Sequence, residues 1–165
     1  NSGLIISYVR SSIPVPAAPT ALAATTVSSS GFVANWSVVA TATDYRLDVA
    51  TEASFASMVP GFNDLDVGGV TSYTVSGLSQ NTPYYYRVRA SSTSGSSAHS
   101  NVIMATTLPN APSAPTAAVA TGVSTTGFTA NWSAVTGATG YRLDVATDAG
   151  FMSYVSGYAD KDGGM

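Results

Sequence analysis

The residues that could perform chemistry in this chain are few and dispersed. Of 165 residues, nine are Asp or Glu and six are Lys or Arg; His99 is the only histidine, and there is no cysteine. No serine lies in a nucleophile-elbow sequence, and no thiol is available as a nucleophile. We therefore expect a protein without catalytic activity or cofactor. His99, in a Ser-rich loop, is interpreted as an exposed imidazole with no functional role.

Paired aspartates are the strongest metal candidates. Asp64 and Asp66 lie two residues apart, and Asp160 and Asp162 repeat this spacing. Two neighbouring carboxylates can share Ca²⁺, but calcium takes about six to eight oxygen ligands and no glutamate follows to complete the set. Lys161 separates the second pair and weakens the metal interpretation there. We interpret both pairs as solubilising loop residues, with calcium binding as the alternative.

Two copies of Asn-Trp-Ser, at residues 35–37 and 131–133, match the pattern for N-glycosylation. Each Asn falls inside an expected strand, directly beside a Trp that we expect in the core. We therefore do not expect either Asn to carry a sugar.

One set of outward-facing side chains could recognise a partner. Tyr85, Arg87 and Arg89 alternate along one expected strand, and Arg46 and Asp48 would face outward on a strand that pairs with it. Tyr and Arg are favoured at interfaces, so this face could bind a protein or a sugar. The alternative, which we favour, is cross-strand pairing of Asp48 with Arg87 or Arg89, worth about a few tenths of a kcal/mol.

An internal repeat organises the elements that must position these residues. Residues 115–165 repeat residues 19–69 at an offset of 96, with 31 of 51 positions identical. Both copies contain Gly-Phe-x-Ala-Asn-Trp-Ser and Tyr-Arg-Leu-Asp-Val-Ala-Thr. The same offset aligns residues 5–20 with residues 101–116. A period near 96 is too long for a solenoid unit and fits one small domain per repeat.

The expected elements within each repeat are short β-strands. Residues 32–37, 45–50 and 84–90 alternate apolar and polar side chains with a period of two. Turn-forming residues separate such segments at intervals of about 8 to 12 residues, and no window shows a sustained helical period. This pattern predicts an all-β, antiparallel sandwich. Prolines before each repeat indicate stiff linkers.

Taken together, these motifs resemble the fibronectin type III domain. They are Trp36, the Tyr45-x-Leu47-x-Val49 strand, and Leu78 followed six residues later by Tyr84, which fits the tyrosine corner of that family. The resemblance covers residues 19–108 fully and residues 115–165 in part. It implies an immunoglobulin-like β-sandwich with a core of Trp36, Tyr45, Leu47, Leu78, Tyr84 and Val88, with Trp132 and Tyr141 equivalent in the second copy.

The repeat and the resemblance predict three parts. Residues 1–18 would be the last strand and Pro-rich linker of a preceding repeat. Residues 19–110 would form one complete domain, and residues 111–165 an incomplete second domain.

The amino-acid sequence of the repeat is similar to that of tandem copies in large secreted or surface-attached bacterial proteins. This resemblance implies an extracellular or cell-surface location, with neighbouring repeats or other copies of the protein as partners and surface or polysaccharide ligands as further candidates. The net charge of −3, spread over isolated residues, gives no reason to expect nucleic acid as a partner. The apolar run at residues 4–6 is too short to span a membrane.

Three functions remain open at this point. The chain could be a structural spacer or adhesive stalk, a self-assembling subunit of an extracellular filament, or an accessory module beside a secreted hydrolase. The partial second repeat is the feature that distinguishes these functions. Apolar side chains such as Phe128, Leu143 and Val145 would each lose about 1.5 to 3 kcal/mol of burial free energy if they stayed exposed, so we expect something to cover them.

Two arrangements of the polypeptide would cover that apolar face. The protein could continue beyond Met165, or another copy could add a strand containing Leu4, Ile6 and Tyr8. We favour a longer array, since one added strand would replace only part of the expected sandwich.

Overall fold

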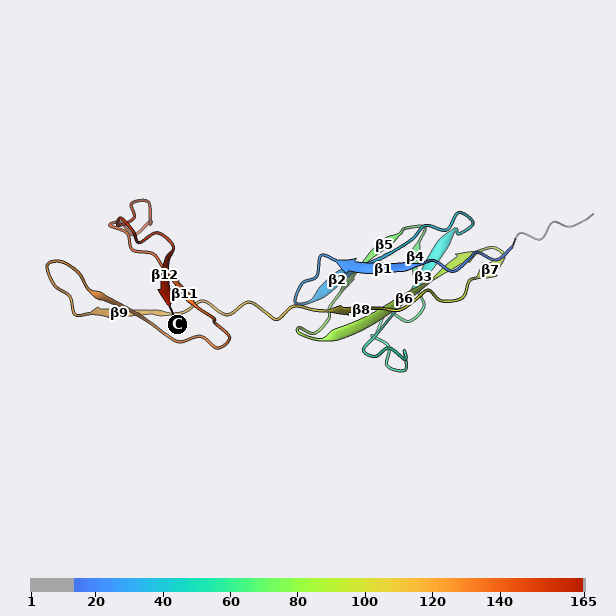
Figure 1. Cartoon of the computed structure of the whole chain (residues 1–165), viewed down its shortest axis with the longest axis horizontal. Coiled ribbons are helices and arrows are strands. Elements are labelled where there is room, and N and C mark those ends of the chain that lie inside the picture. Colours follow the sequence, from blue (N-terminus) through green and yellow to red (C-terminus); the bar gives the residue numbers. More distant parts are fainter. Residues whose placement is uncertain (1–13, 165) are drawn as a thin grey trace, which may run out of the picture. The chain divides into compact units, whose positions relative to one another are not determined.

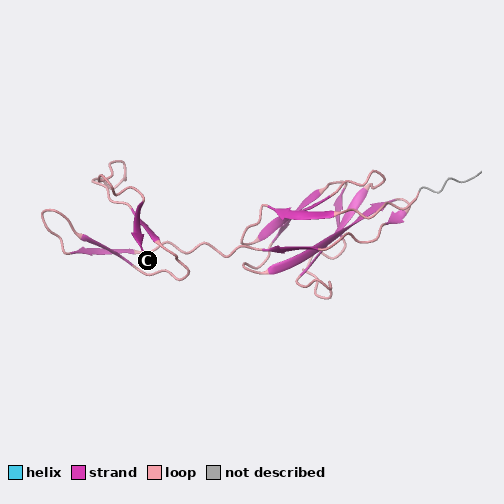
Figure 2. Cartoon of the chain, in the orientation of Figure 1, coloured by secondary structure: helices cyan, strands magenta, loops and turns pink. Residues whose placement is uncertain are grey.

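The structure, a computed structural model, describes residues 14–164. Its regular elements are all β-strands that pair antiparallel, which confirms the all-β prediction (Figure 2). Nothing in the described part of the chain forms a helix long and apolar enough to cross a membrane. The chain divides into two compact units with the boundary between Asn110 and Ala111, and each is described by itself (Figure 1). The candidate assembly residues Leu4, Ile6 and Tyr8 lie outside the described residues.

The first unit is a sandwich of two antiparallel sheets. One sheet has the order β1-β2-β5, and the other has the order β4-β3-β6-β7, with β8 also paired to β6. The strands are β1 (Ala21–Thr25), β2 (Gly31–Trp36), β3 (Asp44–Ala50), β4 (Leu65–Gly68), β5 (Ser72–Ser76), β6 (Pro83–Ser92), β7 (Gly95–Ser96) and β8 (Ile103–Thr106).

The register of β3 against β6 follows from their alternating side chains. Leu47 lies opposite Val88, and the inward side chains on both strands are buried, while Asp48 lies opposite Arg87 on the outer face. A shift of one residue would turn the apolar set outward and the charged set inward, so the pattern specifies this register.

The core lies between the two sheets. The predicted core residues of the first unit are all buried; Trp36, at 2% exposure, packs against Tyr45 with ring centroids 5.8 Å apart. Phe32 stacks on Tyr86 at 5.8 Å, which brings β2 against β6. These aromatic contacts hold the two sheets face to face.

Gly31 permits the close approach of β2 to β5. A Cβ atom at this position would lie 2.1 Å from the carbonyl oxygen of Val75. No side chain fits at that distance, so the glycine of the Gly-Phe motif is required by the neighbouring strand.

The second unit contains four strands in two separate pairs: β9 (Ala117–Thr121) with β10 (Thr129–Trp132), and β11 (Tyr141–Leu143) with β12 (Lys161–Gly164). Ala117 lies opposite Trp132, as Ala21 lies opposite Trp36 in the first unit. The rings of Trp132 and Tyr141 are 5.6 Å apart. Each pair therefore has the register of β1–β2 or β3–β4, displaced by 96 residues.

Candidate functional site

The outer face of β3 and β6 holds a cluster of charged side chains centred on Asp48. Its carboxylate accepts a hydrogen bond from Arg87 Nε at 2.9 Å and one from the backbone N–H of Asp64 at 2.7 Å. The Asp48 side chain is only 6% exposed. A buried carboxylate costs several kcal/mol unless it is paired and hydrogen-bonded, and these donors meet that requirement.

Phe55 covers the other side of this ion pair. The Arg87 guanidinium carbon lies 4.1 Å from the centre of the Phe55 ring. A cation over an aromatic face is attracted by the ring electrons, and the ring also shields the pair from water. Phe55 has a φ of 60°, in the left-handed region, so the sequence pattern did not predict its position.

His99 is exposed, as expected, and its imidazole also lies beside this cluster. Its side chain is 37% exposed, but its Nε2 lies 3.3 Å from Asp48 Oδ2. Burial lowers the pKa of His99, the charges of Arg87 and Arg89 lower it further, and Asp48 acts in the opposite direction. The imidazole is therefore mainly neutral at pH 7, with its Nε2 close to the Asp48 carboxylate.

The paired aspartates of the first unit contact guanidinium groups. Asp64 forms an ion pair with Arg89, and Asp66 lies 3.1 Å from Arg46 Nη2. Within residues 14–164, no group of three or more Asp, Glu or His side chains is placed to hold a metal ion. Cross-strand ion pairing therefore accounts for the position of these carboxylates.

The asparagines of the Asn-Trp-Ser sequences fasten one strand to the next. Asn35 Nδ2 donates to the carbonyl oxygen of Ala23 at 3.0 Å and to Thr25 Oγ1 at 3.1 Å. Asn131 makes the same two contacts, to Val119 at 3.0 Å and to Thr121 at 3.1 Å. These bonds occupy the atom to which a sugar would be attached.

Two polar contacts between distant segments were not predicted. Asn101 bonds both backbone groups of Ala21, accepting from its N–H at 2.9 Å and donating to its carbonyl oxygen at 3.0 Å. Thr107 donates to the carbonyl oxygen of Ser79 at 2.6 Å and accepts from the N–H of Thr82 at 3.0 Å. Both join segments distant in the sequence, so no local motif reveals them.

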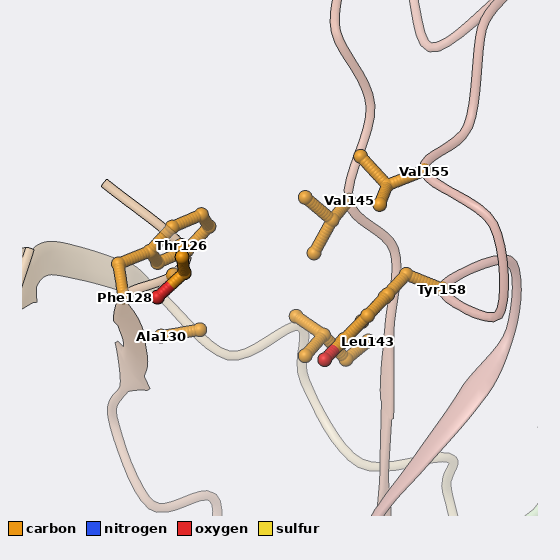
Figure 3. Close-up of a pocket in the computed structure, with 8 residues that line it drawn as sticks. Thr126, Phe128, Ala130, Leu143, Val145, Val155 and Tyr158 are labelled. Atoms are coloured by element: carbon orange, nitrogen blue, oxygen red, sulfur yellow. The ribbon is translucent and has the colours of Figure 1, made fainter. Parts of the chain in front are cut away.

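The second unit has an open apolar face, shown in Figure 3. A pocket of about 210 Å³ lies between Phe128 and Ala130 on one side and Leu143, Val145 and Tyr158 on the other. Phe128 is 51% exposed, whereas its equivalent in the first unit, at position 32, is 1% exposed. Trp132 and Tyr141, predicted as core residues, are partly exposed. We name this surface, lined by Phe128, Ala130, Leu143, Val145, Val155 and Tyr158, the open face.

Comparison with known families identifies the fold. The family model of the fibronectin type III domain matches residues 17–106, which is more than half of the chain. The chain belongs to the fibronectin type III family. None of the curated proteins compared with the chain matches it.

Solved fibronectin type III structures are similar to the chain. The sixth fibronectin type III domain of the human fibronectin type III domain containing protein 3 is 28% identical, with 61% of this chain and 91% of that one covered, and a TM-score of 0.46. The FN5 domain of Drosophila Lar is 23% identical, with 58% and 100% covered and a TM-score of 0.46.

The fibronectin type III domain of the first unit contains the tyrosine corner. Tyr84 is buried, and its hydroxyl accepts the N–H of Ser79 at 3.0 Å, next to the buried Leu78. This contact fixes the turn that leads into β6, the strand that carries Arg87 and Arg89. The fold therefore positions the charged cluster through a feature of its family.

Proposed function

We propose that the chain is a non-catalytic structural or adhesive segment of an extracellular protein, in which fibronectin type III units act as a spacer or stalk. Membership of this family supports the proposal, because fibronectin type III domains are generally non-catalytic modules. Fibronectin type III domains are often extracellular, which supports the extracellular location.

The observation that carries the proposal is the ion pairing on the outer face of the first unit. Arg46, Arg87 and Arg89 each contact an aspartate on a neighbouring strand or turn. Charged side chains that pair with one another contribute to sheet stability and leave little charge available to bind a substrate. This face is therefore suited to holding its own fold.

A stalk must resist extension, which gives the test. The full chain is held by its ends and pulled in single-molecule force measurements. We expect the first unit to give one cooperative unfolding event that lengthens the chain by about 30 nm, since extended chain spans about 3.3–3.6 Å per residue. Gradual extension without a resolved force peak contradicts a load-bearing role.

An adhesive role is distinguished by binding. The full chain and a Tyr85→Ala, Arg87→Gln variant are compared for binding to immobilised polysaccharides. A pure spacer binds none of them. Saturable binding that the variant loses assigns the outer face of β3 and β6 to adhesion.

A further inference from the structure

Charged side chains of the first unit belong to only one of its two sheets. Every Asp, Glu and Arg of residues 14–110 lies on β3, β4 or β6, or in a loop next to one of these strands. The strands β1, β2 and β5 contain no charged residue. On β5 the exposed side chains are the short hydroxyls of Ser72, Thr74 and Ser76. The sheet of β1, β2 and β5 is therefore uncharged up to its edge.

β5 is an edge strand of that sheet. Among the described residues it pairs only with β2, in a register without a bulge. An edge strand presents unpaired backbone N–H and carbonyl groups, and proteins usually protect it with a charged side chain, a proline, a bulge or a covering segment. β5 has the sequence Ser-Tyr-Thr-Val-Ser, so it contains neither a charge nor a proline. The strand is therefore open to pairing with a further strand.

Two other edges of the same unit have the protection that β5 lacks. At the edge formed by β1, the Asn101 side chain bonds the N–H of Ala21 at 2.9 Å and its carbonyl oxygen at 3.0 Å. At the edge formed by β4, the strand carries Asp66, whose carboxylate lies 3.1 Å from Arg46 Nη2. An added strand at either edge would have to displace a side chain or approach a charge, whereas β5 imposes neither cost.

One hydrogen bond shows which backbone groups of β5 point to the free edge. The N–H of Trp36 donates to the carbonyl oxygen of Thr71 at 3.0 Å, just before β5 begins. In an antiparallel pair, residues that bond the neighbouring strand alternate with residues that do not. Thr71 and every second residue after it therefore direct their backbone groups to β2. The residues between them direct theirs to the free edge: Ser72, Thr74 and Ser76.

The sequence of β5 is complementary to an antiparallel copy of itself. With a two-fold axis at Thr74, this residue faces its own copy and Ser72 faces Ser76. These are the residues with outward backbone groups, so the pairs can exchange about six backbone hydrogen bonds. On the inner face, the partly buried Tyr73 would face Val75, and aromatic side chains pair favourably with β-branched ones across antiparallel strands.

We propose that β5 of the first unit pairs antiparallel with β5 of a second copy of this chain, about a two-fold axis at Thr74. The two uncharged sheets of the two copies then form one continuous sheet. A single pair of edge strands buries little surface, so the association is weak and reversible. Two stalks would be joined side by side through this contact, a property that goes beyond the spacer role and does not depend on it.

Sedimentation equilibrium of the full chain measures the association. Thr74→Lys should raise the dissociation constant at least about tenfold, because two lysines would face each other across the axis. Thr106→Lys is the matched control, since Thr106 is an exposed threonine on β8, which pairs only with β6 among the described strands. It should leave the constant unchanged. A full chain that stays monomeric up to about 1 mM overturns the proposal, as does an equal effect of the two substitutions.

A mixture of charge variants tests the two-fold axis. Thr74→Lys and Thr74→Glu chains should each stay monomeric alone, because like charges meet at the axis. Mixed in equal amounts they should associate again, because a lysine then faces a glutamate. A mixture that associates no better than either variant alone shows that Thr74 does not face its own copy, and the proposal is then wrong.

Crosslinking tests the register and does not depend on the lysine variants. The chain has no cysteine, so one introduced cysteine can only form a disulfide between copies. Thr74→Cys should give disulfide-linked dimers under mild oxidation, because residues in a hydrogen-bonded antiparallel pair have Cα atoms about 5.5 Å apart. Ser72→Cys should crosslink far less alone but readily when mixed with Ser76→Cys, which it faces.

Two outcomes point to another surface. Equal crosslinking of Thr74→Cys and Ser72→Cys alone contradicts the register, and association that persists in Thr74→Lys assigns the contact elsewhere on the chain. Either result overturns the proposal. Neither affects the stalk proposal, since the force measurement is made on a single chain.

Discussion

The Asp48 carboxylate and the Arg87 guanidinium lie 2.9 Å apart on facing residues of β3 and β6. They join an acidic half of the domain (residues 14–69, net charge −4) to a basic half (residues 70–108, net charge +2). Because the carboxylate is almost fully buried, removing one partner of this pair costs more than removing one partner of a surface ion pair. It differs in this respect from the pair of Asp66 with Arg46, whose side chains are both more exposed.

We expect Asp48→Asn to lower the free energy of unfolding by about 1 to 3 kcal/mol, since Arg87 would lose its partner in a partly buried site. Asp66→Asn is the matched control, with an expected loss below about 1 kcal/mol. Urea denaturation of the two variants provides the measurement. Equal losses would contradict a special role for the buried pair.

Trp36→Ala should cost about 3 to 5 kcal/mol, because it removes a large side chain that is buried between the sheets. Val38→Ala, at an exposed position two residues away, should change stability by less than about 0.5 kcal/mol. Denaturant melts followed by circular dichroism compare the two. A loss below about 1 kcal/mol for Trp36→Ala would place this residue outside the core.

Stability should fall as the pH drops below about 6.5, because burial lowers the pKa of His99 in the folded state. Below the unfolded pKa the unfolded chain binds more protons than the folded chain, so acid favours unfolding in this window. NMR titration of the single imidazole gives the folded pKa directly. His99→Gln should remove this part of the pH dependence, and a folded pKa above 6.5 would reverse the sign.

Calcium should leave the melting temperature unchanged, since Asp64 and Asp66 contact Arg89 and Arg46. Thermal melts with millimolar Ca²⁺ and with excess chelator test this expectation. A ligand that binds only the folded state raises the melting temperature with its concentration. A rise of several degrees with Ca²⁺ would show that the metal displaces the guanidinium groups.

Gly31→Ala should destabilise the first unit by about 1 to 3 kcal/mol, because the added methyl meets the Val75 carbonyl oxygen. Gly127→Ala should be neutral for stability, since nothing lies within 4 Å. Hydrogen exchange of the first unit confirms that Gly127→Ala leaves it folded.

Local patterns predicted the strands and the side chains they bury. The alternation through residues 45–50 and 84–90 indicated both the strands and their inward faces. The outward positions indicated that Asp48 pairs with Arg87 or Arg89, and the structure shows Arg87 as its partner. Charge pairing across adjacent strands needs only the register, which the apolar pattern specifies.

Contacts that depend on loop conformation could not be predicted in this way. His99 reaches Asp48 from a segment 51 residues away, and Phe55 covers Arg87 through a left-handed backbone conformation. Asn101 contacts Ala21 across 80 residues. Such positions are determined by the assembled fold, and neither periodicity nor turn chemistry specifies them.

The separation of charge within the first unit also bears on errors of folding. In proteins with near-identical neighbouring repeats, misfolding occurs when a half of one repeat pairs with a half of another. Two acidic halves repel each other, as do two basic halves, so wrong pairings of like halves are disfavoured before any core forms. Arg87 and Arg89 of β6 pair with Asp48 and Asp64 of the acidic half, so the attraction between charges favours the pairing of an acidic half with a basic one.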